Sequence, residues 1–148
     1  MIAIVQRVLE ARVRVADRIV GEIGPGMAVL AAVHKTDTAD DISWTAQKLA
    51  GLRIFRNADR HFDLDVRQIN GSILLVSNFT VAAATRQGRR PSLDAAADPA
   101  TGRKLFDDLV AAVKSQGVPV ATGEFGADMR VEIVNDGPVT FIVDSRTP

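Results

Sequence analysis

An unbroken apolar run at residues 27–33 constrains the fold more than any other feature of this chain. A run without polar positions is typical of a strand that is covered on both faces. The turn signal Gly24-Pro25-Gly26 stands directly before it. Residues 73–76 form a second, shorter run of the same kind. The sequence therefore predicts a sheet whose central strands are buried on both sides.

Alternating and β-branched segments predict further strands. Residues 12–15 alternate strictly between arginine and valine, and residues 2–8 alternate more loosely. The last predicted strands are separated by a turn at Gly137-Pro138. The predicted strands are residues 2–8, 12–15, 19–23, 27–33, 52–55, 73–76, 131–133 and 139–143.

Two helices are marked by signals at their ends. Thr38, with Asp41 three residues later, resembles a capping box. Asp98 followed by Pro99 marks the start of the second helix. Apolar residues recur at helical spacing after each start, and a glycine ends each segment, at positions 51 and 117.

The order of these elements predicts an α+β fold. We expect a mainly antiparallel or mixed sheet with two helices packed on one face. The length of 148 residues suits one domain that spans residues 1–148. So few helices leave part of the sheet uncovered, and pairing with a second copy would cover it. The sequence therefore also predicts a dimer.

The composition excludes several classes of function. With 47% hydrophobic and 24% charged residues, the chain is globular rather than disordered. Its 18 basic residues balance 18 acidic ones, so nucleic acid is not held by bulk charge and DNA is not an expected partner. Residues 1–7 lack a secretory leader, and no apolar run is long enough for a bilayer. A cytoplasmic protein without a membrane partner is expected.

Side-chain catalysis has little support. The chain has no cysteine, and its two histidines, His34 and His61, have no second metal-ligand residue at a recognisable spacing. Ser77 lacks the flanking glycines of a nucleophile elbow, because Leu75 and Phe79 occupy those positions. The glycine-rich turn before residue 27 lacks the third glycine of a dinucleotide-binding loop. We therefore expect no metal and no cofactor.

Three polar or flexible segments allow two interpretations each. Residues 86–92 contain three arginines, which can bind phosphates with planar donors or form a solvated loop. Residues 123–129 combine an aromatic side chain and a thioether with two glycines, which suits a pocket rim or an ordinary turn. Gly137-Pro138 can present a rigid backbone edge to a small ligand or serve only as a turn.

Six segments together resemble the D-aminoacyl-tRNA deacylase family, nearly from end to end. Their shared order is more specific than any one of them. The segments are Gln6-Arg7-Val8, Leu52-Arg53-Ile54-Phe55, Ser77-Asn78-Phe79-Thr80, residues 86–92, residues 122–129 and Asn135-Asp136-Gly137-Pro138-Val139-Thr140.

The resemblance implies a homodimeric hydrolase that needs no cofactor. Its substrate would be the ester of tRNA with a D-amino acid, or with glycine mischarged on tRNA-Ala. In the family the Gly-Pro bond is cis and enters the partner subunit's pocket. By this resemblance Gly137 and Pro138 would exclude L-amino acids by overlap. Ser77, Phe79 and Thr80 would line the ester side, with backbone N–H groups of the last two binding the oxyanion.

This chain departs from the family at Asn78, where the family pattern has glutamine. The amide chemistry is the same, but the side chain is one methylene shorter. It can reach its partner through a small backbone shift or a water, or it can lose that contact. The sequence leaves the role of Asn78 in the catalytic segment open.

The resemblance also assigns the remaining site residues. Phe125 and Met129 are expected in the pocket, and Arg86, Arg89 and Arg90 on the tRNA. Two other functions stay open. A non-catalytic tRNA-binding module explains the arginines and the missing acid–base residues equally well. A dimeric small-molecule binder would use the Gly-Pro turn only as a structural element.

Overall fold

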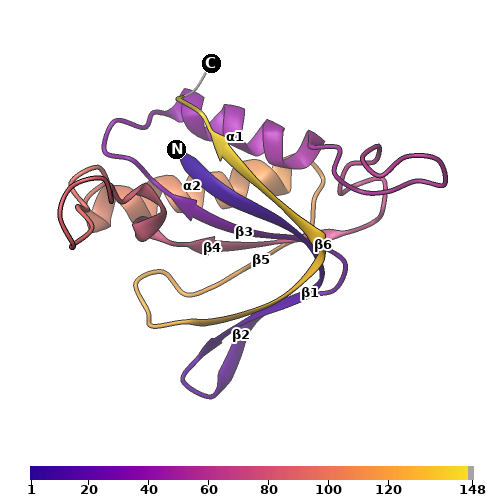
Figure 1. Ribbon diagram of the computed structural model, residues 1–148, viewed down its shortest axis with the longest axis horizontal. Helices are drawn as coiled ribbons and strands as arrows, with labels where there is room; N and C mark the ends of the chain where they lie inside the picture. The colour runs from indigo at the N-terminus through magenta and orange to yellow at the C-terminus, as the bar shows by residue number, and fades with distance from the viewer. Residues whose placement is uncertain (147–148) are drawn as a thin grey trace.

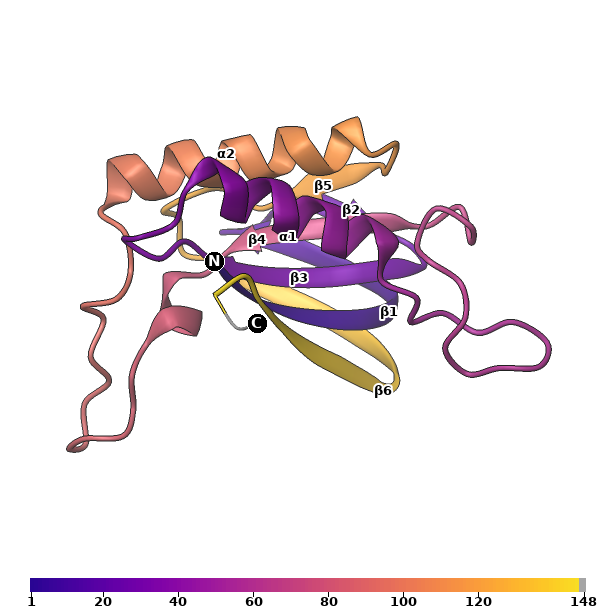
Figure 2. The same ribbon diagram turned by 90° about the horizontal axis from the view of Figure 1, so that it is seen from above.

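The computed structural model describes residues 1–146, and two helices lie side by side over one face of a curled, mixed sheet (Figures 1 and 2). This arrangement confirms the predicted α+β fold. The elements of the described residues are β1 (Ile2–Val15), β2 (Arg18–Ile23), β3 (Gly26–Ala32), α1 (Ala39–Gly51), β4 (Ser72–Ser77), the short 3-10 helix η1 (Phe79–Ala82), α2 (Pro99–Ser115), β5 (Val120–Thr122) and β6 (Arg130–Asp144).

The long strand β1 organises the sheet. On one edge its first half pairs with β3 and its second half with β2, while β6 pairs along its other edge, all antiparallel. β3, β4 and β5 continue the sheet in parallel. The sheet curls so far that a Cβ on Gly21 of β2 would lie 2.2 Å from the carbonyl oxygen of Thr122 on β5. Only glycine allows β2 and β5 to approach so closely.

The curl divides the apolar residues between two cores, and β4 contributes to both. Ile73 and Leu75 face the helices and belong to the larger core. Leu74 and Val76 face the opposite way, into a smaller core inside the curl. All four side chains are buried, which confirms the prediction of a strand covered on both faces.

Both helices begin at the predicted caps. The Thr38 N–H donates to the Asp41 carboxylate at 2.8 Å, and Asp98 accepts hydrogen bonds from the first turn of α2. A hydrogen bond from the Ser145 hydroxyl, and then the bond from Thr38, lower the pKa of Asp41 to about 2. None of the helices in residues 1–146 has the length and apolarity to cross a membrane.

One buried polar group in α1 lacks a partner. Thr45 is 1% exposed, and its hydroxyl makes no hydrogen bond in the described part of the chain. Thr45→Val keeps the shape and removes this hydroxyl, so we expect the free energy of unfolding to rise by about 1 kcal/mol. Urea unfolding at one fixed protein concentration measures this change. As a control, Thr85→Val at an exposed position should leave the free energy of unfolding unchanged. A lower free energy of unfolding for Thr45→Val would show that the Thr45 hydroxyl is hydrogen-bonded.

Two strand predictions are wrong in detail. Residues 52–55 form no strand, and only Phe55 pairs, in an isolated bridge with Leu64. Arg53 instead binds Asp63 of the following loop, so this segment is held by its own loop rather than by a sheet neighbour. Residues 2–8 and 12–15 are one continuous strand, because β6 pairs across the junction between them.

Candidate active site

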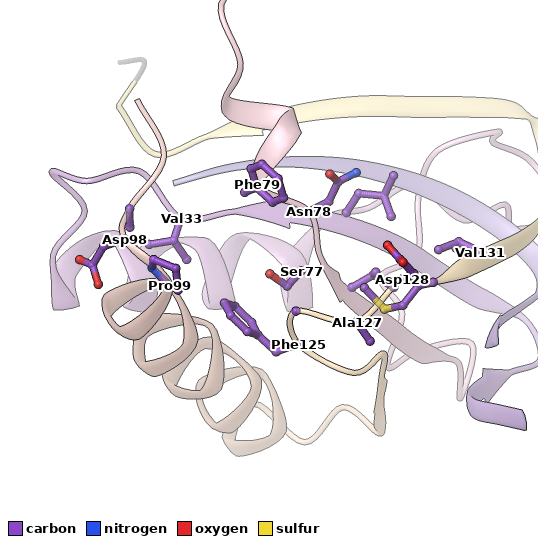
Figure 3. Close-up of a pocket in the computed structure, with 16 residues that line it drawn as sticks. Val33, Ser77, Asn78, Phe79, Asp98, Pro99, Phe125, Ala127, Asp128 and Val131 are labelled. Atoms are coloured by element: carbon purple, nitrogen blue, oxygen red, sulfur yellow. The ribbon is translucent and has the colours of Figure 1, made fainter. Parts of the chain in front are cut away.

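A cavity of about 460 Å³ opens at the end of β4. One side is formed by the end of β4 and the start of η1, and the other by residues 123–129, which we call the pocket loop. In Figure 3, Phe125 of the pocket loop lies between α2 and Ser77. The predicted site residues that line this cavity are Ser77, Asn78, Phe79, Phe125 and Met129.

Unpaired backbone donors lie where β4 passes into η1. The Asn78 N–H is used, because it donates to the Ala31 carbonyl of β3 at 2.8 Å. The N–H groups of Phe79 and Thr80 have no acceptor within residues 1–146. Phe79 is 56% exposed beside the cavity. This segment can therefore donate two hydrogen bonds to a ligand oxygen.

The Asn78 side chain is engaged locally. The Thr80 hydroxyl donates to its Oδ1 at 2.5 Å. Thr80 itself does not line the cavity. The hydroxyl proton therefore points to an amide oxygen, which is not a base that could activate Thr80 as a nucleophile.

The pocket loop forms the opposite wall. Phe125 packs against Phe106 of α2, with ring centroids 6.2 Å apart. A Cβ on Gly123 would lie 2.5 Å from the Met129 sulfur, so glycine allows Met129 to fold back under the loop. Of the two interpretations of residues 123–129, the geometry agrees with the pocket rim, because Phe125, Gly126 and Met129 line the cavity.

Acid–base side chains are sparse around the cavity. Asp98 and Asp128 line it, but hydrogen bonds from Thr101 lower the pKa of Asp98, which caps α2. Neither His34 nor His61 is among the lining residues. Partial burial lowers the pKa of His34, which favours its neutral form. The described residues contain no cluster of ligands suited to a metal. The titratable side chains that line the cavity are therefore the carboxylates of Asp98 and Asp128.

Gly137 and Pro138 lie on β6 and do not line this cavity. Thr140 pairs with Gln6 and Asn135 with Val8, so residues 136–139 bulge out opposite a single residue of β1. We call residues 136–139 the Gly-Pro segment. The predicted turn between two strands is thus a bulge within one strand, and the Gly137-Pro138 peptide bond is cis. The middle of β6 lies at the other end of the sheet from the pocket loop (Figure 1).

Asn135 braces the Gly-Pro segment from one end. Its Oδ1 accepts from the Val139 N–H at 2.7 Å, and its Nδ2 donates to the Val139 carbonyl at 3.2 Å. The same Nδ2 donates to Gln6 Oε1 at 3.0 Å. One amide side chain therefore closes the bulge and ties it to β1.

Arg7 holds the other end. Its side chain is 2% exposed, and its Nε donates to the Asp136 carbonyl at 3.1 Å and pairs with the Asp136 carboxylate at 3.0 Å. Its Nη1 donates to the Ile54 carbonyl at 2.7 Å. Sequence reasoning missed this buried cation. The signal was its position, because Arg7 continues the inward-facing series of Ala3 and Val5.

The three arginines of residues 86–92 are exposed and lie away from the cavity lining. Their segment is a narrow loop closed by backbone pairing between Ala84 and Ser92. It follows η1 and projects beyond the sheet (Figure 2). The loop therefore leaves the sheet just after η1, whose first residue lines the cavity.

Sequence comparisons agree with this architecture. A family model described as D-Tyr-tRNA(Tyr) deacylase matches residues 4–144. The D-aminoacyl-tRNA deacylase of Geobacter sulfurreducens is 52% identical over 147 residues, which cover 99% of this chain and 97% of that protein. That of Pelobacter propionicus is 51% identical over 144 residues, or 97% of this chain and 99% of that protein.

One solved structure also has a similar fold. A c-Myc DNA unwinding element binding protein superposes with a TM-score of 0.93 at 30% identity, over 99% of this chain and 100% of that one. The curled mixed sheet under two helices is therefore a fold that this chain shares with that protein. The chain belongs to the D-Tyr-tRNA(Tyr) deacylase family. It is therefore an enzyme that hydrolyses an ester bond.

Proposed function

We propose that this deacylase releases D-amino acids, and glycine mischarged on tRNA-Ala, from the terminal adenosine of tRNA. The observation that carries this proposal is a cavity lined by Phe79, whose backbone N–H is free, with the free N–H of Thr80 next along the chain and no catalytic triad among the lining residues. The relatives from Geobacter and Pelobacter carry the name D-aminoacyl-tRNA deacylase at about half identity, which supports the same substrate class here.

The backbone donors suit the charge that develops during ester hydrolysis. When water adds to the ester carbonyl, its oxygen becomes an oxyanion, and the N–H groups of Phe79 and Thr80 donate to it. Each preorganised donor of this kind typically contributes about a hundredfold in rate or more. Ser77 and Asn78 complete this side of the cavity.

The leaving group can supply the missing proton relay. When the tetrahedral intermediate collapses, the bond between the carbonyl carbon and the ribose oxygen breaks. That oxygen takes up the proton that the attacking water has lost, passed on by the neighbouring 2′-hydroxyl. The only groups needed are the water, the substrate and the two backbone donors, which agrees with the sparse titratable residues around the cavity.

Chirality is read by the Gly-Pro segment of a second subunit. Gly137 and Pro138 are exposed, lie in a bulge of β6, and do not line the cavity of their own chain. Only a neighbouring copy can bring them to a cavity of this kind. A braced stretch of backbone there would overlap the side chain of an L-amino acid, but not a D side chain or the hydrogen of glycine.

The surface of β6 supports a homodimer. Among the described strands, β6 pairs only with β1, so its other edge is free. Ile142 is 69% exposed, and Phe141 and Val134 are exposed on the same strand. An apolar edge strand of this length needs cover, and a second copy would provide it. The Gly-Pro segment of β6 would then enter the cavity of the partner subunit.

In this proposal the loop of residues 86–92 supplies the tRNA contacts. Arg86, Arg89 and Arg90 are exposed on a loop that follows directly on η1 and the free donors. The net charge of the whole chain is zero, so a polyanion must be bound by arginines that are clustered locally. Their planar groups suit phosphate oxygens.

Release of amino acid from matched tRNA esters tests the function. We expect wild-type protein to cleave D-tyrosyl-tRNA at least about a hundredfold faster than L-tyrosyl-tRNA. A time course with both esters, at equal enzyme and tRNA concentrations, measures the ratio. A protein that binds tRNA without releasing either amino acid would be a binding module, and equal rates on both esters would contradict the chirality proposal.

A further inference from the structure

The pocket loop has few hydrogen bonds to the rest of the chain. Gly123 donates to the Leu75 carbonyl at 3.2 Å where the loop leaves β5, and Ala127 donates within the loop to Glu124 at 3.2 Å. Gly126 has a φ of +81°, a conformation that favours glycine. Between these points the loop carries Phe125, the aromatic part of the cavity wall. The position of the pocket loop must therefore be fixed by side-chain contacts.

Arg18 of β2 pairs with Glu124 of the loop at 3.9 Å, and Arg103 of α2 makes the contacts to Phe125. Its Nη2 donates to the Phe125 carbonyl at 3.2 Å, and its guanidinium carbon lies 4.7 Å from the centre of the Phe125 ring. The ring thus packs against both Arg103 and Phe106 of α2, the second at a centroid distance of 6.2 Å. Gly102 is buried beneath it, and a Cβ there would meet the ring at 3.6 Å. One side chain therefore fixes both the backbone and the ring of the cavity wall.

We infer that Arg103 is a positioning residue that sets the width of the cavity by holding Phe125. It acts through Phe125 and is not itself among the cavity-lining residues. Only arginine can stack on a ring and donate to a neighbouring carbonyl with one planar group. This inference rests on the proposed function, in which the cavity binds the aminoacylated adenosine.

An exposed arginine beside a cavity could instead bind a tRNA phosphate, and two substrates separate the roles. D-tyrosyl-tRNA carries phosphates, whereas the 3′ ester of D-tyrosine with adenosine carries none. For Arg103→Met we expect the KM to rise about tenfold on both substrates, with kcat within about twofold of wild type. Arg103→Lys should fall between Met and wild type, because it keeps the charge without the planar fork.

Lys104→Met is the matched control. Lys104 is the next residue of α2, carries the same charge, and pairs with Asp108 on the helix surface at 2.7 Å. We expect its KM to stay at the wild-type value on both substrates. A rise in KM for Arg103→Met on the tRNA ester alone, or full rescue by Arg103→Lys, would assign Arg103 to phosphate binding and overturn the inference.

Amide hydrogen exchange gives a readout that does not depend on catalysis. In Arg103→Met, residues 124–128 should exchange about fivefold faster or more, while the Lys104→Met control and the rest of α2 keep wild-type rates. Unchanged exchange in this loop would contradict the positioning role. Wild-type protein that cleaves neither substrate would refute the proposed function, and the exchange result would still decide the role of Arg103.

Discussion

Gly137→Ala is expected to lower the rate of D-tyrosyl-tRNA cleavage by about a hundredfold, the typical effect of a displacement of about 1 Å at a reacting centre. Gly137 has a φ of +147°, which L-residues with a side chain rarely adopt. An added Cβ would lie 2.6 Å from Val139 Cγ2 and 2.8 Å from the Val139 nitrogen. Because Val139 is held by Asn135, the strain must move the Gly-Pro segment itself.

Single-turnover cleavage by the purified variant, with melting temperature and molecular mass as checks on folding, measures this effect. Gly24→Ala is the matched control, since a Cβ at Gly24 meets no atom within 4 Å. It should cleave at the wild-type rate. If a folded Gly137→Ala protein kept its rate on the D ester within a few-fold, the Gly-Pro segment would not contribute to the site.

Ile142→Glu is expected to separate the subunits and to abolish most activity with them. Ile142 is the most exposed large apolar residue of β6, and with Phe141, Trp44 and Leu52 it lines a surface hollow of about 550 Å³. Burying an unpaired carboxylate in an interface costs several kcal/mol, so the dimer dissociation constant should rise at least about a hundredfold. Light scattering across a dilution series measures the mass, and D-tyrosyl-tRNA cleavage is followed in the same samples.

Ile19→Glu provides the control for this substitution. Ile19 is exposed on β2 and is not part of the hollow beside β6. It should leave both mass and rate unchanged. A monomeric Ile142→Glu protein with the wild-type rate would show that one chain contains the whole site, and a variant that stayed dimeric would place the interface elsewhere.

Most of the secondary structure could be predicted from the sequence where the local signals were strong. The caps at Thr38 and Asp98 start the helices as predicted, because their side chains satisfy N–H groups that any helix leaves unpaired. The apolar run at residues 27–33 predicted β3 as a strand buried on both faces. These features depend on neighbours a few residues away, so the sequence alone determines them.

Features that depend on distant pairing were not readable. Residues 52–55 have a strand-like sequence, but they pair with no strand of the sheet, and only Phe55 forms a bridge, to Leu64. The bulge at residues 136–139 exists because two stretches of β6 pair with β1 in different registers. The sequence marked its Gly-Pro pair as a turn and gave no sign of the register change or of the contact between this bulge and Arg7.

The same difference between local and distant contacts applies to the candidate site. The segment from Ser77 to Thr80 and the pair Phe125 and Met129 were expected in one site, and all of them except Thr80 line one cavity. Asp98 entered the sequence analysis only as a cap, and Arg103 was missed. Both belong to α2, whose position against the pocket loop is set by tertiary packing. Helical spacing predicts which face of α2 is apolar, but not which loop lies beside it.

A mixed dimer tests the central claim, which is that each cavity is completed by the Gly-Pro segment of the other subunit. One subunit carries Gly137→Ala, and the other carries Ala127→Trp, which fills the cavity that Ala127 lines. Each parent homodimer should cleave D-tyrosyl-tRNA at about a hundredth of the wild-type rate or less. The purified mixed dimer unites one intact cavity with one intact Gly-Pro segment across the twofold axis, and should cleave at about half the wild-type rate. A mixed dimer as inactive as its parents would contradict the claim.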